Sequence, residues 1–330
     1  MMMITRTLAA LAVLALSGCG ATTTPPASAP ALQFQTIAAP ASQFPNTAIT
    51  FPTGIVSDLV TTTIAGSSGA TVGGLYNLTT SAWIPLEVPA AASTAAYGPA
   101  VTAAGYRVVG SYKLPGVPTD NAYFYDSGTN TYTTIDPPPS YCVPNLCNEA
   151  IAHSNYGTTT FQVVGNCDSV ANGPGLGVYP TTAHAFLYDS ASATFTKIDV
   201  TGAVSTTAYG IWSDPGEVAV AGGYTDAQGT HAYVRGLTSG TMLTYNYPGA
   251  LLTHFEGVTG AGGPGDYNLA GDIGSISSGG LYGFFLPVRN WVAGTPILLG
   301  SHSANSVYQN TVIGVTTTGT PPMGYIVTVP

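Results

Sequence analysis

The chain has 330 residues and a formal net charge of -9, and only 6% of its residues are charged. Soluble globular chains usually contain about a quarter of charged residues, so the solvated surface here must be built mainly from Thr, Ser, Asn, Gly and Tyr. Six lysines and arginines are present, with no cluster among them. Nucleic acid is therefore excluded as a partner, because no group of basic side chains can neutralise phosphates.

The N-terminus has the layout of an export signal. Arg6 precedes an apolar run over residues 8–16, which is too short to span a bilayer as a permanent helix. The run ends in Leu16-Ser-Gly-Cys19, which resembles a bacterial lipobox, where the cysteine receives a diacylglyceryl thioether. An ordinary signal peptide cut near Ala21 is the alternative interpretation.

Three segments follow from this interpretation. Residues 1–18 are expected to be a lipoprotein signal peptide, 19–31 a lipidated Cys19 with a flexible Ala/Thr/Pro tether, and 32–330 the folded domain. Acyl chains on Cys19 would make the lipid bilayer the first partner of the protein. Gly20, rather than Asp, after the cysteine suggests the cell outer membrane by resemblance to Gram-negative sorting rules.

A short motif returns six times along the chain: two apolar or small residues precede a glycine, and a strand with a large apolar anchor follows about a dozen residues later. Successive anchors lie between 41 and 63 residues apart, and roughly 40 to 50 residues are needed for four antiparallel strands with short turns. The glycines are Gly66, Gly110, Gly165, Gly222, Gly271 and Gly314, and the anchors are Leu75, Tyr123, Phe186, Tyr233, Phe284 and Tyr325.

The repeat predicts an all-β fold, a six-bladed β-propeller of four-stranded antiparallel blades; a sandwich or a β-helix are the other all-β candidates. After the expected tether the chain begins with a strand at 34–37 that lacks a preceding partner strand, and it ends with a strand at 323–327 that lacks a following one. We therefore expect the N- and C-terminal strands to share one blade, which closes the ring and removes an exposed strand edge.

The third copy also carries a family resemblance. His184-Ala-Phe-Leu-Tyr, with Thr196-Lys-Ile-Asp199, Thr207-Ala-Tyr-Gly-Ile211 and Gly222-Gly-Tyr-Thr-Asp226, resembles the extracellular HAF repeat family of bacteria. Residues 73–327 are covered by the resemblance, which implies a secreted or surface-exposed propeller-like protein and brings no catalytic residues. Because His184 and His231 occupy a repeated position, we expect both to have structural roles.

Three cysteines remain once Cys19 is assigned to lipid. An oxidising envelope compartment favours at least one disulfide. Cys147 and Cys167 are equally distant from Gly157, the middle of an expected hairpin, so they can face each other across its open end. A bond between Cys142 and Cys147 is the alternative.

Two insertions, at 137–147 and 168–182, interrupt the otherwise regular repeat. Both should emerge on the same face of a propeller, and departures from a repeat are where function is most often placed. Neutral drift of exposed loops is the competing explanation. The candidate binding residues are Tyr141, Asn145, Glu149, His153, Asp168 and Tyr179.

Catalytic and metal-binding patterns are weak in this sequence. His153, His254 and His302 come from different repeats without metal-ligand spacing, and Glu149 and Glu256 lie near two of them. We therefore expect no metal, no cofactor and no catalytic residues. The sequence favours a noncatalytic envelope lipoprotein that binds a protein partner or a glycan through one loop face; the alternative is an envelope hydrolase or lyase acting on a polysaccharide or lactone.

Overall fold

The computed structural model describes residues 31–45, 47–66, 69–142, 147, 149–168, 182–275, 281–316 and 321–330. Within these residues the chain is all-β: one short 3-10 helix, η1 (Pro139–Cys142), accompanies 25 strands. In the described residues, no helix is both long enough and apolar enough to cross a membrane. The region from Leu32 to Pro330 forms one compact unit.

Most strands belong to four-stranded antiparallel sheets. One contains β2 (Thr47–Val56), β3 (Leu59–Gly66), β4 (Thr71–Asn77) and β5 (Trp83–Leu86); the next contains β6 (Ser93–Thr102), β7 (Gly105–Lys113), β8 (Asn121–Asp126) and β9 (Thr131–Thr134). A third contains β10 (Glu149–Tyr156), β11 (Gln162–Asp168), β12 (His184–Asp189) and β13 (Thr194–Lys197).

A nine-stranded sheet follows along the chain. Its first part is β14 (Ser205–Asp214), β15 (Glu217–Asp226), β16 (Gly229–Gly236) and β17 (Met242–Tyr245). Its second part is β18 (Ala250–Gly263), β19 (Asp266–Ser275), β20 (Leu281–Arg289), β21 (Val292–Ala293) and β22 (Ile297–Leu298). A single parallel pair, Thr230 with Leu252, connects the two parts, so each part is otherwise an antiparallel sheet of its own.

The last sheet joins both ends of the folded region. β23 (Ser306–Tyr308), β24 (Thr311–Val315) and β25 (Gly324–Thr328) come from the C-terminus, and β1 (Phe34–Ile37) pairs antiparallel with β25. The expectation that N- and C-terminal strands share one sheet is therefore confirmed. Pairing β25 on both sides leaves fewer exposed backbone groups at this position.

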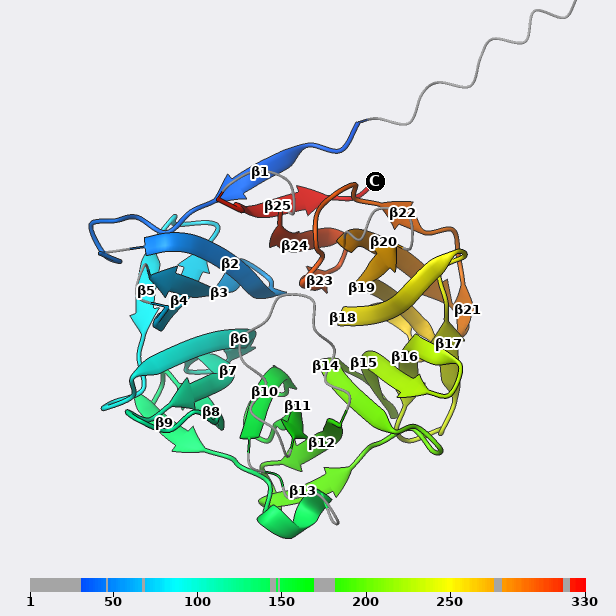
Figure 1. Cartoon of the computed structure of the whole chain (residues 1–330), viewed down its shortest axis with the longest axis horizontal. Coiled ribbons are helices and arrows are strands. Elements are labelled where there is room, and N and C mark those ends of the chain that lie inside the picture. The colour runs from blue at the N-terminus through cyan, green and yellow to red at the C-terminus, as the bar shows by residue number, and fades with distance from the viewer. Residues whose placement is uncertain are drawn as a thin grey trace, which may run out of the picture. The chain divides into compact units, whose positions relative to one another are not determined.

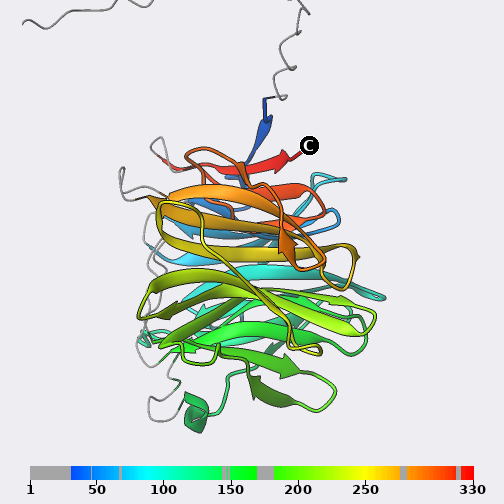
Figure 2. The ribbon, with the colours of Figure 1, turned by 90° about the vertical axis from the view of Figure 1, so that its right-hand side faces the viewer.

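The sheets are arranged radially around a central axis, as in a β-propeller (Figure 1). The strands nearest the axis are β2, β6, β10, β14, β18 and β23, and each is followed by strands progressively farther out (Figure 1). Figure 2 shows the sheets from the side. We call the side on which these inner strands begin the insertion face and the side on which they end the opposite face.

A layer formed by a glycine and an aromatic ring recurs five times, twice in the nine-stranded sheet and once in each of three other sheets. Gly110 on β7 pairs with Tyr123 on β8, and a Cβ on Gly110 would lie 2.0 Å from the Ala95 carbonyl oxygen and 2.9 Å from the Tyr123 ring. Only glycine fits where the ring crosses the second strand so closely. The same pairing joins Gly165 to Phe186, Gly222 to Tyr233, Gly271 to Phe284 and Gly314 to Tyr325.

The tyrosines of this layer reach the inner strand. The hydroxyl groups of Tyr123, Tyr233 and Tyr325 donate to the carbonyl oxygens of Ala95, Thr207 and Ser303 at 3.2, 3.0 and 2.6 Å. Each ring is buried, and burial raises the pKa of all three phenols. One side chain thus ties three strands together.

The sheet of β2–β5 differs from this rule, and our assignment of Gly66 and Leu75 was wrong there. Thr62 pairs with Gly74 at the equivalent register, whereas Gly66 pairs with Thr47 at the far end of β3. Glycine has moved from the second strand to the third, where a Cβ would lie 2.6 Å from the Thr62 hydroxyl oxygen. The exchange preserves one small residue per pair, so the strands still approach closely.

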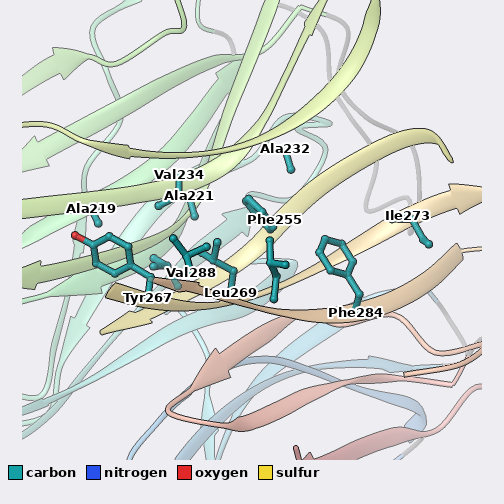
Figure 3. Close-up of a cluster of buried hydrophobic side chains, with 12 residues drawn as sticks. Ala219, Ala221, Ala232, Val234, Phe255, Tyr267, Leu269, Ile273, Phe284 and Val288 are labelled. Atoms are coloured by element: carbon teal, nitrogen blue, oxygen red, sulfur yellow. The ribbon is translucent and has the colours of Figure 1, made fainter. Parts of the chain in front are cut away.

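The core consists of apolar side chains between neighbouring sheets. Its largest cluster lies between β14–β16 and β18–β20, where Phe255, Leu269 and Phe284 are fully buried (Figure 3). The alanines at 219, 221 and 232 face this cluster and make room for the larger rings. Alternating small and large residues allow neighbouring sheets to pack at close range.

Candidate functional site

Five of the six inner strands carry an irregularity at an equivalent position. The register of β2, β6, β10, β14 and β18 shifts by one residue, a β-bulge, where each strand passes the axis. A bulge redirects the side chain of the extra residue. These residues are Thr53, Tyr97, His153, Tyr209 and Glu256; Asn305, between Ser303 and Ser306, occupies the equivalent place before β23. We call these six residues the axial ring.

Contacts between neighbours connect the axial ring. The His153 ring lies 5.0 Å from Tyr97 and 4.6 Å from Tyr209, measured between ring centroids. The Thr53 hydroxyl donates to the Ala96 carbonyl at 2.5 Å, and the Asn305 amide donates to the Pro52 carbonyl at 2.7 Å. Side chains from successive sheets therefore contact one another or the neighbouring backbone around the axis.

The space enclosed at the axis is small. A cavity of about 40 Å³ is lined by inner-strand residues, including His153, Tyr209 and Glu256. One water needs roughly 10–15 Å³ of such volume, so the cavity has room for a few waters or an ion. It is far smaller than the roughly 300–1,000 Å³ of typical small-molecule pockets.

Three potential metal ligands converge beside this cavity. His254 and Asp272 face each other across β18 and β19, and Glu256 lies two residues after His254. His254 Nδ1 lies 2.8 Å from Glu256 Oε1, and one ligand atom from each of the three residues lies within 4.8 Å of the others. Asp272 Oδ1 also accepts a 2.7 Å hydrogen bond from the backbone N–H of Ala304. We call these three residues the His–Glu–Asp cluster.

Burial determines the charge state of this cluster. It raises the pKa of Glu256 to about 8 and that of Asp272 to about 7, the Glu256 carboxylate adding to the effect on Asp272. It also lowers the pKa of His254 to about 3. His254 and Asp272 are both only 4% exposed, while the Glu256 side chain is 21% exposed. Charge on the carboxylates is thus disfavoured without a nearby cation.

Burial also shifts the pKa values of His153, Tyr97 and Tyr209 in the axial ring. Burial lowers the pKa of His153 to about 3, and it raises the pKa of Tyr97 and Tyr209 well above their ordinary value. At neutral pH the imidazole of His153 is therefore uncharged. Of the candidate residues predicted from sequence, His153 is the one that the structure places in this ring.

Other predicted residues lie at the insertion-face end of β10 and β11. Cys147 and Cys167 form a disulfide there, with a Cα–Cα distance of 5.4 Å. Glu149 pairs in register with Asp168, and both are buried. The Thr182 hydroxyl donates to Asp168 Oδ1 at 2.6 Å. Tyr141 is half-buried and donates to the Ala185 carbonyl at 3.0 Å, so it helps hold η1 against β12.

Several sequence predictions concern residues outside the described part of the chain. These are Cys19, Asn145 and Tyr179, as well as the side chain of Cys142. The structure therefore does not place the proposed lipidation site or the middle of either insertion.

The repeated histidines take part in sheet contacts. His184 Nδ1 lies 2.6 Å from Asp199 Oδ2, and His231 Nδ1 lies 2.7 Å from Asn246 Oδ1. Asp199 also accepts the backbone N–H of Ala185 at 2.9 Å. Asp199 therefore connects the end of its own strand to β12. His302 packs against Phe34, with ring centroids 4.5 Å apart, in the sheet shared by the two ends.

The sequence showed Glu256 near His254, but Asp272 was not predicted to lie beside them. Asp272 follows Gly271 directly, and the corresponding residues after the other repeat glycines are Ser111, Asn166, Gly223 and Val315. Aligning the sheets by register, rather than by glycine motif alone, is the signal that finds the cluster.

Several connections on the insertion face carry an exposed aliphatic side chain. Val204 is 64% exposed, Leu251 63% and Met323 51%, and Leu114 and Val117 are also exposed. Each lies where a chain segment connects two strands on this face or where an inner strand begins. Val101 and Val292 are exposed on the opposite face.

No protein-family model matches the chain, and no curated protein does. Solved structures with similar folds include oligogalacturonate lyase from Vibrio parahaemolyticus, with 12% identity, a TM-score of 0.45, and coverage of 91% of this chain and 97% of that one. TolB from Acinetobacter baumannii has 11% identity and a TM-score of 0.47, covering 86% and 64%. Trypanosoma rangeli sialidase has 9% identity and a TM-score of 0.46, covering 86% and 55%. Likenesses this distant carry no conclusion about activity.

Proposed function

We propose that this chain is a noncatalytic cell-envelope lipoprotein whose β-propeller binds a partner protein through the insertion face. The observation that carries the proposal is that several connections on this face each expose an aliphatic side chain, foremost Val204, Leu251 and Met323. Exposed apolar surface has a free-energy cost in water that burial against a partner removes. The insertions next to the disulfide would add variable contacts at the same face.

We infer that the propeller has six blades. The nine-stranded sheet counts as two blades in this interpretation, because a single parallel pair, Thr230 with Leu252, joins its halves. The equivalent bulges, one on each of five inner strands, and the matching position of Asn305 support the count.

A protein partner fits this face better than a glycan. Aliphatic side chains pack against apolar protein groups, whereas sugar recognition relies on aromatic faces with polar atoms beside them. Among the residues that the structure describes, the exposed hydrophobic side chains named on this face are valine, leucine and methionine. Binding of a glycan is accordingly the competing outcome that the experiment must be able to reveal.

The noncatalytic part of the proposal is supported by the size of the axial cavity. At about 40 Å³ it cannot enclose a sugar ring. A polysaccharide hydrolase or lyase would need a larger site elsewhere.

The membrane part of the proposal depends on Cys19. Lipidation there would anchor the propeller to the outer membrane through the 19–31 tether. Labelling of the wild type with a fatty-acid analogue, with loss of label in Cys19→Ser, would support the anchor. Equal labelling of both proteins would contradict it.

Site-specific photocrosslinking in cells tests the binding face. A photoreactive residue at Val204 or Leu251 should give discrete crosslinked products with a partner protein, and the same residue at Val101 or Val292 should not. These four positions are similarly exposed, at 64, 63, 49 and 65%, so the control is matched for accessibility. Equal crosslinking on both faces, or products that contain only glycan, would contradict the proposal.

A further inference from the structure

We propose that the His–Glu–Asp cluster beside the axis is a binding site for one divalent transition-metal ion, such as Zn²⁺ or Mn²⁺. His254, Glu256 and Asp272 offer one imidazole nitrogen and two carboxylate oxygens. This mixed set of donors suits these ions better than Ca²⁺ or Mg²⁺, which prefer oxygen ligands alone.

The geometry places the three donors on one side of two adjacent strands. His254 and Asp272 are directly opposite in the antiparallel pair, where Cβ atoms lie about 4.5–5.5 Å apart. The bulge at Glu256 turns its side chain towards His254, and the nitrogen and oxygen atoms are 2.8 Å apart. Ligand atoms within 4.8 Å of one another need only small side-chain rotations to reach the roughly 2.0–2.2 Å bonds of a zinc ion.

Two features complete the site. Asp272 is oriented by the Ala304 N–H, the kind of outer hydrogen bond that holds metal-ligating carboxylates in place. Glu256 also lines the axial cavity, which has room for the water that would complete the coordination of an ion. A divalent cation would balance the charge of the two carboxylates, which lie close together beside His254.

The other sheets show that the fold does not require these residues. At the three equivalent positions they carry Phe51, Thr53 and Thr63; Ala95, Tyr97 and Ser111; Ile151, His153 and Asn166; Thr207, Tyr209 and Gly223; and Ser303, Asn305 and Val315. None of these sets supplies three metal ligands. The backbone thus forms the same bulge with quite different side chains, so the cluster serves a need other than folding.

Metal titration of the full chain by isothermal calorimetry tests the site, using ZnCl₂ and MnCl₂ as separate probes. We expect one ion per chain for at least one of these metals. Glu256→Gln and Asp272→Asn should each weaken its binding by about 100-fold. Glu87→Gln, which changes an exposed carboxylate, should bind as the wild type does. Absence of saturable binding, or equal binding by all four proteins, would overturn the proposal.

A second measurement on the wild-type chain does not depend on how the variants fold. Imidazole resonances recorded during the same titration should show His254 changing at one equivalent of metal, while His184 and His231 stay unchanged. A change confined to histidines other than His254 would overturn the proposal.

Discussion

The glycine–aromatic layer and the axial ring lie on the same sheets, but they differ in how their residue types vary. In five places the layer keeps a glycine opposite Tyr or Phe, as in Gly222 with Tyr233. The axial ring keeps its backbone bulge while its side chain changes between Thr, Tyr, His, Glu and Asn. Positions at which both the backbone geometry and the residue type repeat, such as the glycine–aromatic pairs, are therefore the ones that the fold requires.

Positions at which the backbone geometry repeats but the residue type varies, such as the axial ring, can accept different side chains without disturbing the fold. At the bulge, the inner strand supplies a fixed direction and accepts many side chains. Chemistry specific to one sheet, such as the His–Glu–Asp cluster, can be placed there without loss of the repeat. Four changes test this distinction, from the largest expected effect to the smallest.

Gly222→Ala should have the largest effect on the layer. The new Cβ would lie 2.0 Å from the Thr207 carbonyl oxygen, a backbone atom that cannot move freely. We expect a loss of about 3 kcal/mol or more in the free energy of unfolding, measured in urea. Gly240→Ala is the control, because its Cβ would meet nothing within 4 Å and only its positive φ of 71° has a cost, about 1 kcal/mol. Equal losses would contradict the packing explanation.

The double variant Cys147→Ser/Cys167→Ser tests whether the disulfide, which occurs in a single sheet, contributes to the free energy of unfolding. The disulfide joins residues separated by 20 positions, and closing a loop of that length stabilises a fold by about 3 kcal/mol. The double variant should lose that amount in urea unfolding, and a reducing agent should remove the difference from the wild type. A wild-type protein unaffected by reduction would show that the bond contributes little.

His153→Phe sharpens the comparison at the axial ring. At pH 7 the histidine is neutral and contacts two tyrosine rings, so we expect a change below about 1 kcal/mol. The pKa of His153 is lowered in the folded state, to about 3, so the unfolded chain binds a proton first as pH falls below 6.5. The wild type should thus lose about 3 kcal/mol more than the variant between pH 6.5 and 4.

The control for the pH series is His153→Gln, which also removes the titrating ring. Both variants should lack the same part of the acid dependence in urea unfolding. If both lose stability in parallel with the wild type, His153 does not account for it.

Tyr233→Phe should have the smallest effect on the layer. It removes the 3.0 Å hydrogen bond to Thr207 and keeps the ring over Gly222, so we expect a loss of about 1 kcal/mol. Phe186 and Phe284 already occupy this place in two sheets, which indicates that the hydroxyl is dispensable. Tyr224→Phe, which removes an exposed 3.4 Å contact to Thr244, should change unfolding by less than half as much. A larger loss in the control would contradict the role of the buried bond.

Much of the fold could be predicted from the repeat, because glycine and aromatic positions are imposed by close packing and leave a periodic signal. The sheet of β2–β5 was not predicted correctly, because there the glycine, Gly74, lies on the third strand and the larger residue, Thr62, lies on the second. The pairing of Cys147 with Cys167 was predictable from their symmetry about a hairpin turn.

The site was harder to predict, because it depends on register rather than motif. The insertions predicted as the site lie within residues 137–182, whereas His254, Glu256 and Asp272 come together where β18 and β19 pair. These residues are 16 to 18 positions apart across the hairpin, and no short motif contains all three. A bulge of one residue decides which side chain turns towards the axis.

The central claim is that a bulge position of the axial ring can carry a metal site without disturbing the fold. Its most direct test is a crystal structure of the full chain grown with Zn²⁺ or Mn²⁺, with diffraction recorded on both sides of the metal absorption edge. We predict one anomalous peak bounded by His254, Glu256 and Asp272, with the metal within about 2.3 Å of an atom from each. A fully ordered cluster with no peak between its side chains, or a peak held only by residues elsewhere, would contradict the account.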